Sequence, residues 1–599
     1  MRARRARPTN AERHSSPSHG TDGLVDGALV LGRTAVIAMA QLLAAVLATP
    51  PTGRVWHFTD IHVDPLYVMN SSIHDNCNGA VTNDTSAGLF GNATGNCATP
   101  WKLYRSALDF MTVENPPVDF ILFTGDYTQA GLHSENLTDG VRDTILRTHI
   151  ELKAKLPSTT KVYGSVGNHD SWPGDNFPYP CGQTCQPSYD VLAQLWDLDD
   201  AGRATVADFG GFAQQAAPGL TIISPNTMYW TNLNVHVKAG SKDGAYGFGF
   251  KQMAWLGSEL DKAAARKDAV WLLGHVPGDM WLEEHTTKYQ QLIEKHSTMI
   301  KGQFYGHDHT DGVKLTRACP TSNCTGKPTG VLWAAPSLTE GYPSENPGIR
   351  LMRYDTKAKD KYAFTHAETY SMDLEEANKK GRAEWRLEYD ANSAYNLTDL
   401  SPSSWEKWVQ RTLSVNESAF LNYLKLRRRG FNGPFSSSGT PCAGLNRTCF
   451  AKEACYIMHV GVAATAECVR RTCHSIPPVQ PFEYKVTMGG IKWCSGGGDY
   501  SVGNVFGKGN DGPHCPLIPK GWSMNETAVK CEAICTPAAE CVGFTLYPMN
   551  ASAGSGHGQE TPKECCFRTG TVASKPKAPG SHVRCYAKPP MKVVCGVPS

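Results

Sequence analysis

Short apolar runs that alternate with amphipathic stretches set the strongest limit on how this chain can fold. Between residues 54 and 370 these runs are Arg54–Thr59, Val118–Thr124, Lys161–Val166, Leu220–Ser224, Ala269–Leu273, Gly302–Tyr305, Gly330–Ala334 and Ile349–Tyr354. They are mostly apolar throughout, which is typical of strands covered on both faces. Helical patterns separate them, as in Val141–Leu156 and in residues 252–265. Strands that alternate with helices predict an α/β layered fold.

Polar side chains of a few kinds follow five of these runs. The segments are Asp60-Ile-His62, Gly125-Asp126, Gly167-Asn168-His169-Asp170, Gly274-His275 and Gly306-His307-Asp308-His309. Ligands of α/β sheets collect outside the carboxyl ends of the strands, so we expect these loops to converge on one rim. Taken alone, each segment has a simpler explanation as a solvated loop or a turn. All five in order at strand ends favour a shared site.

Seven of these side chains have the donor chemistry of a two-metal site. They are two carboxylates, four imidazoles and one amide, from Asp60, His62, Asp126, Asn168, His275, His307 and His309. Such donors suit Zn²⁺, Mn²⁺ or Fe²⁺, and seven are too many for one tetrahedral ion. A pair of ions about 3.5–4 Å apart would use them all. Two divalent ions outweigh two carboxylates, so the site favours an anionic phosphorus compound over a peptide.

The five segments together resemble the calcineurin-like metallophosphoesterase superfamily, and specifically the acid sphingomyelinase-like phosphodiesterases. Further matching stretches are Asp60–Tyr67, Gly167–Pro173, Phe250–Leu256, and the pair Cys77 and Cys97 ahead of Pro100-Trp-Lys-Leu. The resemblance covers residues 53 to about 470. It implies a layered β-sandwich metallophosphoesterase core flanked by helices in residues 53–370, with a small helical, disulfide-closed subdomain in residues 371–475.

The resemblance also implies the role of each site residue. One metal would be held by Asp60, His62 and His309 and the other by Asn168, His275 and His307, with Asp126 bridging them. Two divalent ions, expected to be Zn²⁺, would activate a water to attack a phosphodiester. His169 would protonate the leaving oxygen, a step worth about 10²–10⁴-fold, and Asp170 would orient its ring.

Two features depart from the family pattern. The family places a second catalytic histidine shortly after the Gly-Asp segment, whereas here the next histidine is His133. His133 is either that catalytic residue or a surface histidine. Sphingomyelinases of the family also carry a saposin-like domain before the catalytic region, and here about five residues separate the expected cleavage point from Arg54. This favours saposin-free relatives that act on nucleotide-type and other soluble phosphoesters, with a sphingomyelin-type lipid as the alternative.

The cysteines indicate an oxidising compartment. Of 20 cysteines, six precede residue 371, four lie between residues 442 and 468, and ten follow from Cys473 onward. Each number is even, so every region can close its own disulfides. Ten Asn-x-Ser/Thr sequons agree with a secreted glycoprotein.

Residues 1–48 are expected to be a leader with a signal peptide. The apolar run 35–48 is interrupted only by Gln41 and is shorter than the about 20 residues that span a bilayer. We expect a secreted protein or one of a lysosome-like compartment. An uncleaved anchor at residues 35–48 is the alternative.

The remaining regions differ in character from the α/β part. In residues 371–475, aromatic and apolar side chains such as Trp385, Leu387, Trp405 and Trp408 suggest short packed helices. Residues 476–599 form a Cys-rich module that weakly resembles apple or PAN-like domains. That module would contact a glycan or a protein, or be an inert cap. An adhesion protein working through this tail is the rival from a different functional class.

The formal net charge of +2 reveals no basic surface for nucleic acid. We expect a monomer whose partner is a small-molecule or lipid phosphodiester.

Overall fold

The computed structural model describes residues 52–475 except for short gaps, and six strands further along the chain. The gaps are residues 82–86, 94–96, 130–136, 321–323, 340–344, 358–360, 415 and 432–446. The chain divides into two compact units, Met1–Val469 and Arg470–Ser599. The predicted leader, residues 1–48, lies outside the described residues. Among the helices of the described part, none combines the length and apolar character needed to cross a bilayer.

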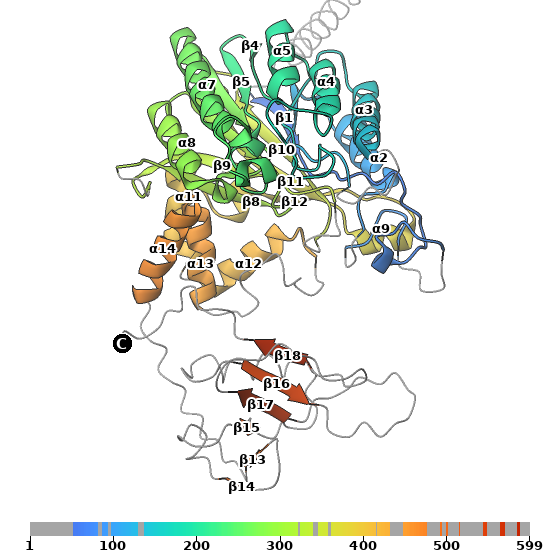
Figure 1. Cartoon of the computed structure of the whole chain (residues 1–599), viewed down its shortest axis with the longest axis vertical. Coiled ribbons are helices and arrows are strands. Elements are labelled where there is room, and N and C mark those ends of the chain that lie inside the picture. The colour runs from blue at the N-terminus through green and yellow to red at the C-terminus, as the bar shows by residue number, and fades with distance from the viewer. Residues whose placement is uncertain are drawn as a thin grey trace, which may run out of the picture. The chain divides into compact units, whose positions relative to one another are not determined.

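Two six-stranded sheets form the centre of the first unit (Figure 1). In order across the first sheet, the strands are β12 (Arg386–Asp390), β11 (Phe364–Ser371), β10 (Gly348–Asp355), β1 (Thr52–Phe58), β2 (Phe120–Phe123) and β3 (Lys161–Gly164). Strands β1, β2 and β3 run parallel, whereas β10, β11 and β12 pair antiparallel.

The second sheet has a parallel centre with antiparallel edges. Its order is β4 (Phe212–Ala217), β5 (Leu220–Ser224), β6 (Ala269–Leu273), β7 (Ile300–Tyr305), β9 (Pro328–Ala334) and β8 (Gly312–Arg317). The pairs β5·β6, β6·β7 and β7·β9 are parallel, and β4 and β8 close the two sides antiparallel.

Aromatic side chains fill the space between the sheets. Trp271 of β6 is fully buried. Its ring centroid lies 5.5 Å from that of Phe120, 5.2 Å from that of Tyr354 and 5.0 Å from that of Phe364, all residues of the first sheet. Its indole N–H donates to the carbonyl oxygen of Tyr362 at 3.0 Å, so its polar atom is satisfied as well. The predicted layered β-sandwich is confirmed.

Helices cover the outer faces. They are α2 (Trp101–Asp109), α3 (Leu137–Lys155), α4 (Gln186–Leu195), α5 (Asp200–Phe209), α7 (Ala245–Arg266) and α8 (Glu283–Lys295), and α7 contacts β5 and β6 (Figure 1). Helix α7 forms because its buried residues, Phe248, Met253, Leu256, Leu260 and Ala263 among them, recur every three to five positions along one face. It ends at Lys267, whose φ of 63° cannot continue a right-handed helix.

All eight predicted strands are present, but four others were missed: β4, β8, β11 and β12. These four strands pair antiparallel, and three of them (β4, β8 and β12) are edge strands. Polar and apolar residues mix in such strands. Leu387 was expected on a helix and instead lies in edge strand β12, where it is largely exposed. The prediction of a helix there was wrong because pairing with β11 outweighs a local pattern of mixed residues.

The helical region after β12 packs directly on the sandwich. It contains α10 (Ala391–Ala394), α11 (Pro402–Trp408), α12 (Glu417–Arg427), α13 (Arg447–Met458) and α14 (Val462–Ser475). The Trp405 ring lies 5.7 Å from that of Trp333 in β9, and α13 contacts β8. Helices α11 and α13 therefore pack against the second sheet, whereas α10 contacts β11 and β12 of the first.

Disulfides close short segments within the first unit, as the even number of cysteines predicted. The bridges are Cys77–Cys97, Cys181–Cys185, Cys319–Cys324 and, in the helical region, Cys455–Cys468. In the second unit the described strands form one antiparallel sheet in the order β14 (Asp499–Tyr500), β13 (Ile491–Trp493), β15 (His514–Cys515), β17 (Glu564–Arg568), β16 (Gly543–Tyr547) and β18 (Arg584–Ala587).

Replacing Trp271 by alanine is expected to lower the free energy of unfolding by about 3–5 kcal/mol, because it leaves a cavity between the sheets. Val113→Ala, at a side chain that is 72% exposed, is the control and should change it little. Denaturant unfolding followed by circular dichroism measures both. A loss below about 1 kcal/mol for Trp271→Ala would show that this ring does not hold the sheets together.

Candidate metal centre

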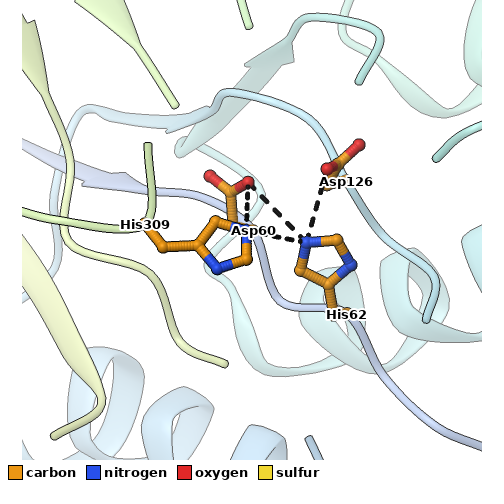
Figure 2. Close-up of side chains that lie close together, drawn as sticks. All are labelled: Asp60, His62, Asp126 and His309. Atoms are coloured by element: carbon orange, nitrogen blue, oxygen red, sulfur yellow. Dashed lines mark hydrogen bonds and ion pairs between the residues drawn. The ribbon is translucent and has the colours of Figure 1, made fainter. Parts of the chain in front are cut away.

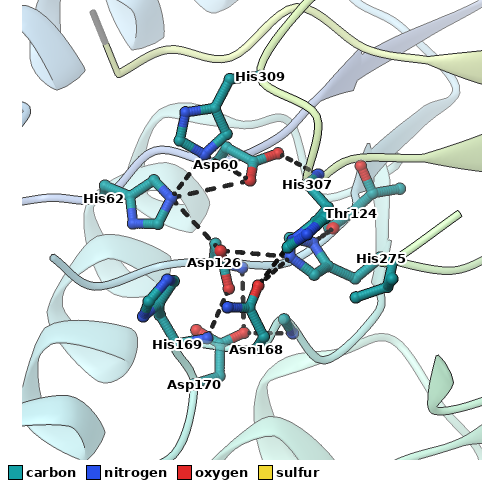
Figure 3. Close-up of polar contacts among 12 residues, drawn as sticks. Asp60, His62, Thr124, Asp126, Asn168, His169, Asp170, His275, His307 and His309 are labelled. Carbon is teal, nitrogen blue, oxygen red and sulfur yellow. Dashed lines mark hydrogen bonds and ion pairs between the residues drawn. The ribbon is translucent and has the colours of Figure 1, made fainter. Parts of the chain in front are cut away.

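The seven side chains predicted as metal ligands meet at one end of the sandwich (Figure 3). They come from the loops that follow β1, β2, β3, β6 and β7, all parallel strands whose carboxyl ends share one rim. Several backbone hydrogen bonds join the first two loops. The Asp60 N–H donates to the carbonyl of Gly125 at 3.0 Å, and the His62 N–H donates to that of Asp126 at 3.2 Å.

The backbone at the site is held in an unusual conformation. Five of the seven residues have positive φ: Asp60 (48°), His62 (37°), Asp126 (61°), His307 (70°) and His309 (59°). A non-glycine residue in this region costs about 1–3 kcal/mol, so the surrounding structure must enforce it. Gly125, with φ 94°, allows close approach, since a Cβ there would lie 2.7 Å from the Gly167 nitrogen and 2.8 Å from His275 Nδ1.

One cluster of donors consists of Asp60, His62, Asp126 and His309 (Figure 2). His62 Nε2 lies 3.1 Å from His309 Nε2 and 3.3 Å from Asp126 Oδ2. Asp60 Oδ1 lies 3.3 Å from His309 Nε2. All four donor atoms lie within 4.8 Å of one another, which is the spacing of ligands around one ion.

The second cluster consists of Asp126, His275 and His307, with the amide of Asn168 between the two histidines (Figure 3). Asn168 Oδ1 lies 2.9 Å from His275 Nε2 and 2.9 Å from His307 Nδ1. Asp126 Oδ2 lies 3.2 Å from His275 Nε2. Asp126 thus belongs to both clusters.

The donor set fits cations. The Nδ1 atoms of His62 and His275 face the carbonyl oxygens of Thr128 (2.8 Å) and Thr124 (2.6 Å), and since a carbonyl can only accept, each Nδ1 carries the proton. In the neutral rings each Nε2 then presents a lone pair to the carboxylates. Asp60 Oδ1 and Asp126 Oδ2 are buried and accept no hydrogen bond. Converging acceptors of this kind need positive charge between them, and the two clusters have the donors that a dinuclear metal site would use.

Without metal, the electrostatics of the site attract protons instead. Burial acts against the charged form of His275, but the carboxylates of Asp126 and Asp60 outweigh it and raise its pKa to about 10. His307 behaves in the opposite way. Its burial and the nearby charge of His275 lower its pKa to about 3. The cluster therefore draws in positive charge through its carboxylates.

His169 lies at the edge of the two clusters, with its ring centroid 5.3 Å from that of His62. Its backbone N–H donates to Asp126 Oδ1 at 2.8 Å, and its side chain is half-buried. Among the described residues, none forms a hydrogen bond with its ring. Burial lowers the pKa of this ring to about 4.

Asp170 was expected to orient the His169 ring, but its hydrogen bonds go elsewhere. Its carboxylate accepts from the backbone N–H groups of Gly167 (2.7 Å), Tyr127 (2.8 Å) and Asp126 (3.2 Å). Burial and the neighbouring Asp126 raise its pKa to about 6. Asp170 therefore ties the loop after β2 to the loop after β3.

Other residues of the site gave no signal in the sequence. The carbonyl oxygens of Thr124 and Thr128 orient two of the histidines, and any residue type supplies a carbonyl. His133 lies outside the described residues.

Two family models match the chain. Residues 53–311 match the calcineurin-like phosphoesterase model, and residues 335–475 match the acid sphingomyelin phosphodiesterase C-terminal region. Cyclic GMP-AMP phosphodiesterase SMPDL3A of Bos taurus is 30% identical over 72% of this chain and 93% of its own length. The Homo sapiens protein of that name is 29% identical over 70% of this chain and 91% of its own. Sphingomyelin phosphodiesterase of Bos taurus is 29% identical over 65% of this chain and 62% of its own.

We expect purified protein to contain two divalent ions per chain. Asp126→Asn should lower that number to one or fewer, because this carboxylate serves both clusters. Elemental analysis after dialysis measures the stoichiometry. Asp268→Asn is the matched control, since Asp268 is a buried carboxylate bonded to Thr221 and Arg266 outside the site. Two ions in both variants would exclude a shared carboxylate.

Proposed function

Since the chain belongs to the acid sphingomyelinase-like phosphodiesterases, a family of phosphoric diester hydrolases, we propose that its metal centre hydrolyses soluble, nucleotide-type phosphodiesters. The observation that carries this proposal is the pair of donor clusters sharing Asp126 at the rim of the sandwich. Two of the relatives matched over nine-tenths of their length are named cyclic GMP-AMP phosphodiesterases, which supports a nucleotide-type substrate.

The residues of the site are proposed to bind the two ions in two groups. Asp60, His62 and His309 would hold one ion, Asn168, His275 and His307 the other, and Asp126 would lie between them. When bound, such a pair of ions acidifies water and neutralises the charge of the phosphodiester. The carbonyl groups of Thr124 and Thr128 keep the ligand rings turned toward the carboxylates, so little rearrangement is needed on binding.

His169 is proposed as the general acid that protonates the leaving oxygen. Its half-buried ring lies beside His62 and is not engaged by other described residues, so it can reach a substrate on the ions. Its backbone N–H is anchored to Asp126, which fixes its distance from the site. We assign Asp170 a positioning role, because its carboxylate accepts hydrogen bonds from three backbone N–H groups. His133 stays a prediction for a second acid.

We further propose that the ions are zinc and that the protein is a secreted monomer. Imidazole, carboxylate and amide ligands suit zinc, and the disulfides of the first unit require an oxidising compartment. The helical residues 371–475 are proposed to complete the catalytic region, and the Cys-rich tail from residue 476 to contact a glycan or a protein.

A substrate panel tests the proposed activity. We expect cyclic GMP-AMP to be hydrolysed faster than sphingomyelin in mixed micelles and faster than p-nitrophenyl phosphate, a monoester. His307→Ala should abolish turnover and lower metal content while circular dichroism stays unchanged. Faster turnover of sphingomyelin than of the other two would overturn the nucleotide-type assignment, and full activity of His307→Ala would overturn the site.

The role of His169 gives a separate prediction. His169→Gln should lower kcat on cyclic GMP-AMP by about 10²–10⁴-fold with the metal content unchanged. On bis-p-nitrophenyl phosphate the loss should be much smaller, because p-nitrophenolate leaves without a proton. His296→Gln, a buried histidine in the loop after α8, is the control and should leave both rates unchanged. Equal losses on the two substrates would argue against an acid role for His169.

A further inference from the structure

The loop between β7 and β8 carries two of the metal ligands, His307 and His309, in strained backbone conformations. Their φ values are 70° and 59°. The loop follows Gly306 at the end of β7 and leads directly into β8, which starts at Gly312. Contacts from outside the loop must therefore hold both ligands in place.

The helical region supplies contacts to three consecutive residues of this loop. Asp308 Oδ2 accepts a hydrogen bond from the hydroxyl of Tyr456 in α13 at 3.2 Å. The carbonyl oxygen of His309 accepts from Arg429 Nη1 at 3.2 Å. In the next position, Thr310 Oγ1 accepts from Arg427 Nη2 at 3.2 Å.

Arg429 makes several further contacts that hold its side chain in place. It lies two residues after α12, and its side chain is fully buried. Nη1 forms an ion pair with the buried Glu345 at 2.7 Å, Nε donates to the carbonyl of Asn346, and the Asn346 amide donates to the Arg429 carbonyl at 3.0 Å. A guanidinium can serve these separate acceptors at fixed angles, and a lysine ammonium of shorter reach cannot.

We infer that Arg429 is a positioning residue of the metal centre, which binds the carbonyl of His309 and thereby sets the direction of this ligand toward Asp60 and His62. The inference rests on the proposed metal site and extends it. Through Arg429 the helical region takes part in metal binding, although none of its own side chains belongs to either donor cluster of the described residues.

Arg429→Lys tests this role. We expect it to bind one of its two Zn²⁺ ions about 10–100-fold less tightly than the wild type, the usual effect of removing a group that orients a ligand. The affinity is measured by competition with a chromophoric chelator at a temperature where circular dichroism shows folded protein. The absorption bands of the Co²⁺-loaded protein, which report ligand geometry, should also change.

Arg317→Lys is the matched control. Arg317 is likewise a buried arginine that joins the helical region to the sandwich, through the Met458 carbonyl at 2.7 Å and Glu406, but it does not contact residues 307–311. It should keep wild-type Zn²⁺ affinity and Co²⁺ bands even if its melting temperature falls. If Arg429→Lys fails to fold, Glu345→Gln, which keeps the guanidinium and removes its ion pair, should show the same selective change in smaller degree.

The outcomes distinguish the proposed function from the positioning role of Arg429. A wild type that binds no Zn²⁺ would refute the proposed function itself. The positioning role alone would be overturned by a different result. In that case the wild type binds two ions, and the folded Arg429 or Glu345 variant keeps wild-type affinity and unchanged Co²⁺ bands. Equal losses of affinity in the Arg429 and Arg317 variants would also overturn it, because a general loss of stability would then explain both.

Discussion

The crowding of hydrogen-bond acceptors at one end of the sandwich is the constraint on which the rest of the structure depends. Carboxylate oxygens, an amide oxygen and imidazole lone pairs face one another at 2.9–3.7 Å. Such an arrangement is unfavourable without positive charge, so the surrounding structure must hold these side chains in place. Parallel strands bring the loops to one rim. Hydrogen bonds that the Asp170 carboxylate and the carbonyls of Thr124 and Thr128 accept fix the loops there.

The sheets supply the rigidity that this arrangement needs. Aromatic rings around Trp271 pack the two layers together, so the strand ends that carry ligands from different sheets keep a fixed separation. His275 follows β6 of the second sheet, while Asp126 follows β2 of the first, and their atoms meet at 3.2 Å. A shift between the layers would therefore disturb each donor cluster.

Much of the fold could be predicted from the sequence, because buried parallel strands are continuous apolar runs. Strands β11 and β12 could not, since antiparallel strands near a sheet edge mix polar and apolar residues and Leu387 there is exposed. The convergence of the seven predicted side chains could be predicted because glycine, histidine and aspartate recur at strand ends. The direction of the Asp170 carboxylate and the contact of Arg429 with a carbonyl could not, because both depend on tertiary placement of backbone groups.

The position of Asp126 in both clusters means that the two halves of the site cannot be filled independently. The same oxygen, Oδ2, faces His62 of one cluster and His275 of the other. A cation on one side would draw electron density from this oxygen and repel a second cation. It would also order the carboxylate that the second cation needs. If both clusters hold a cation, their loading is coupled through this side chain, and a binding isotherm with two unequal steps is expected.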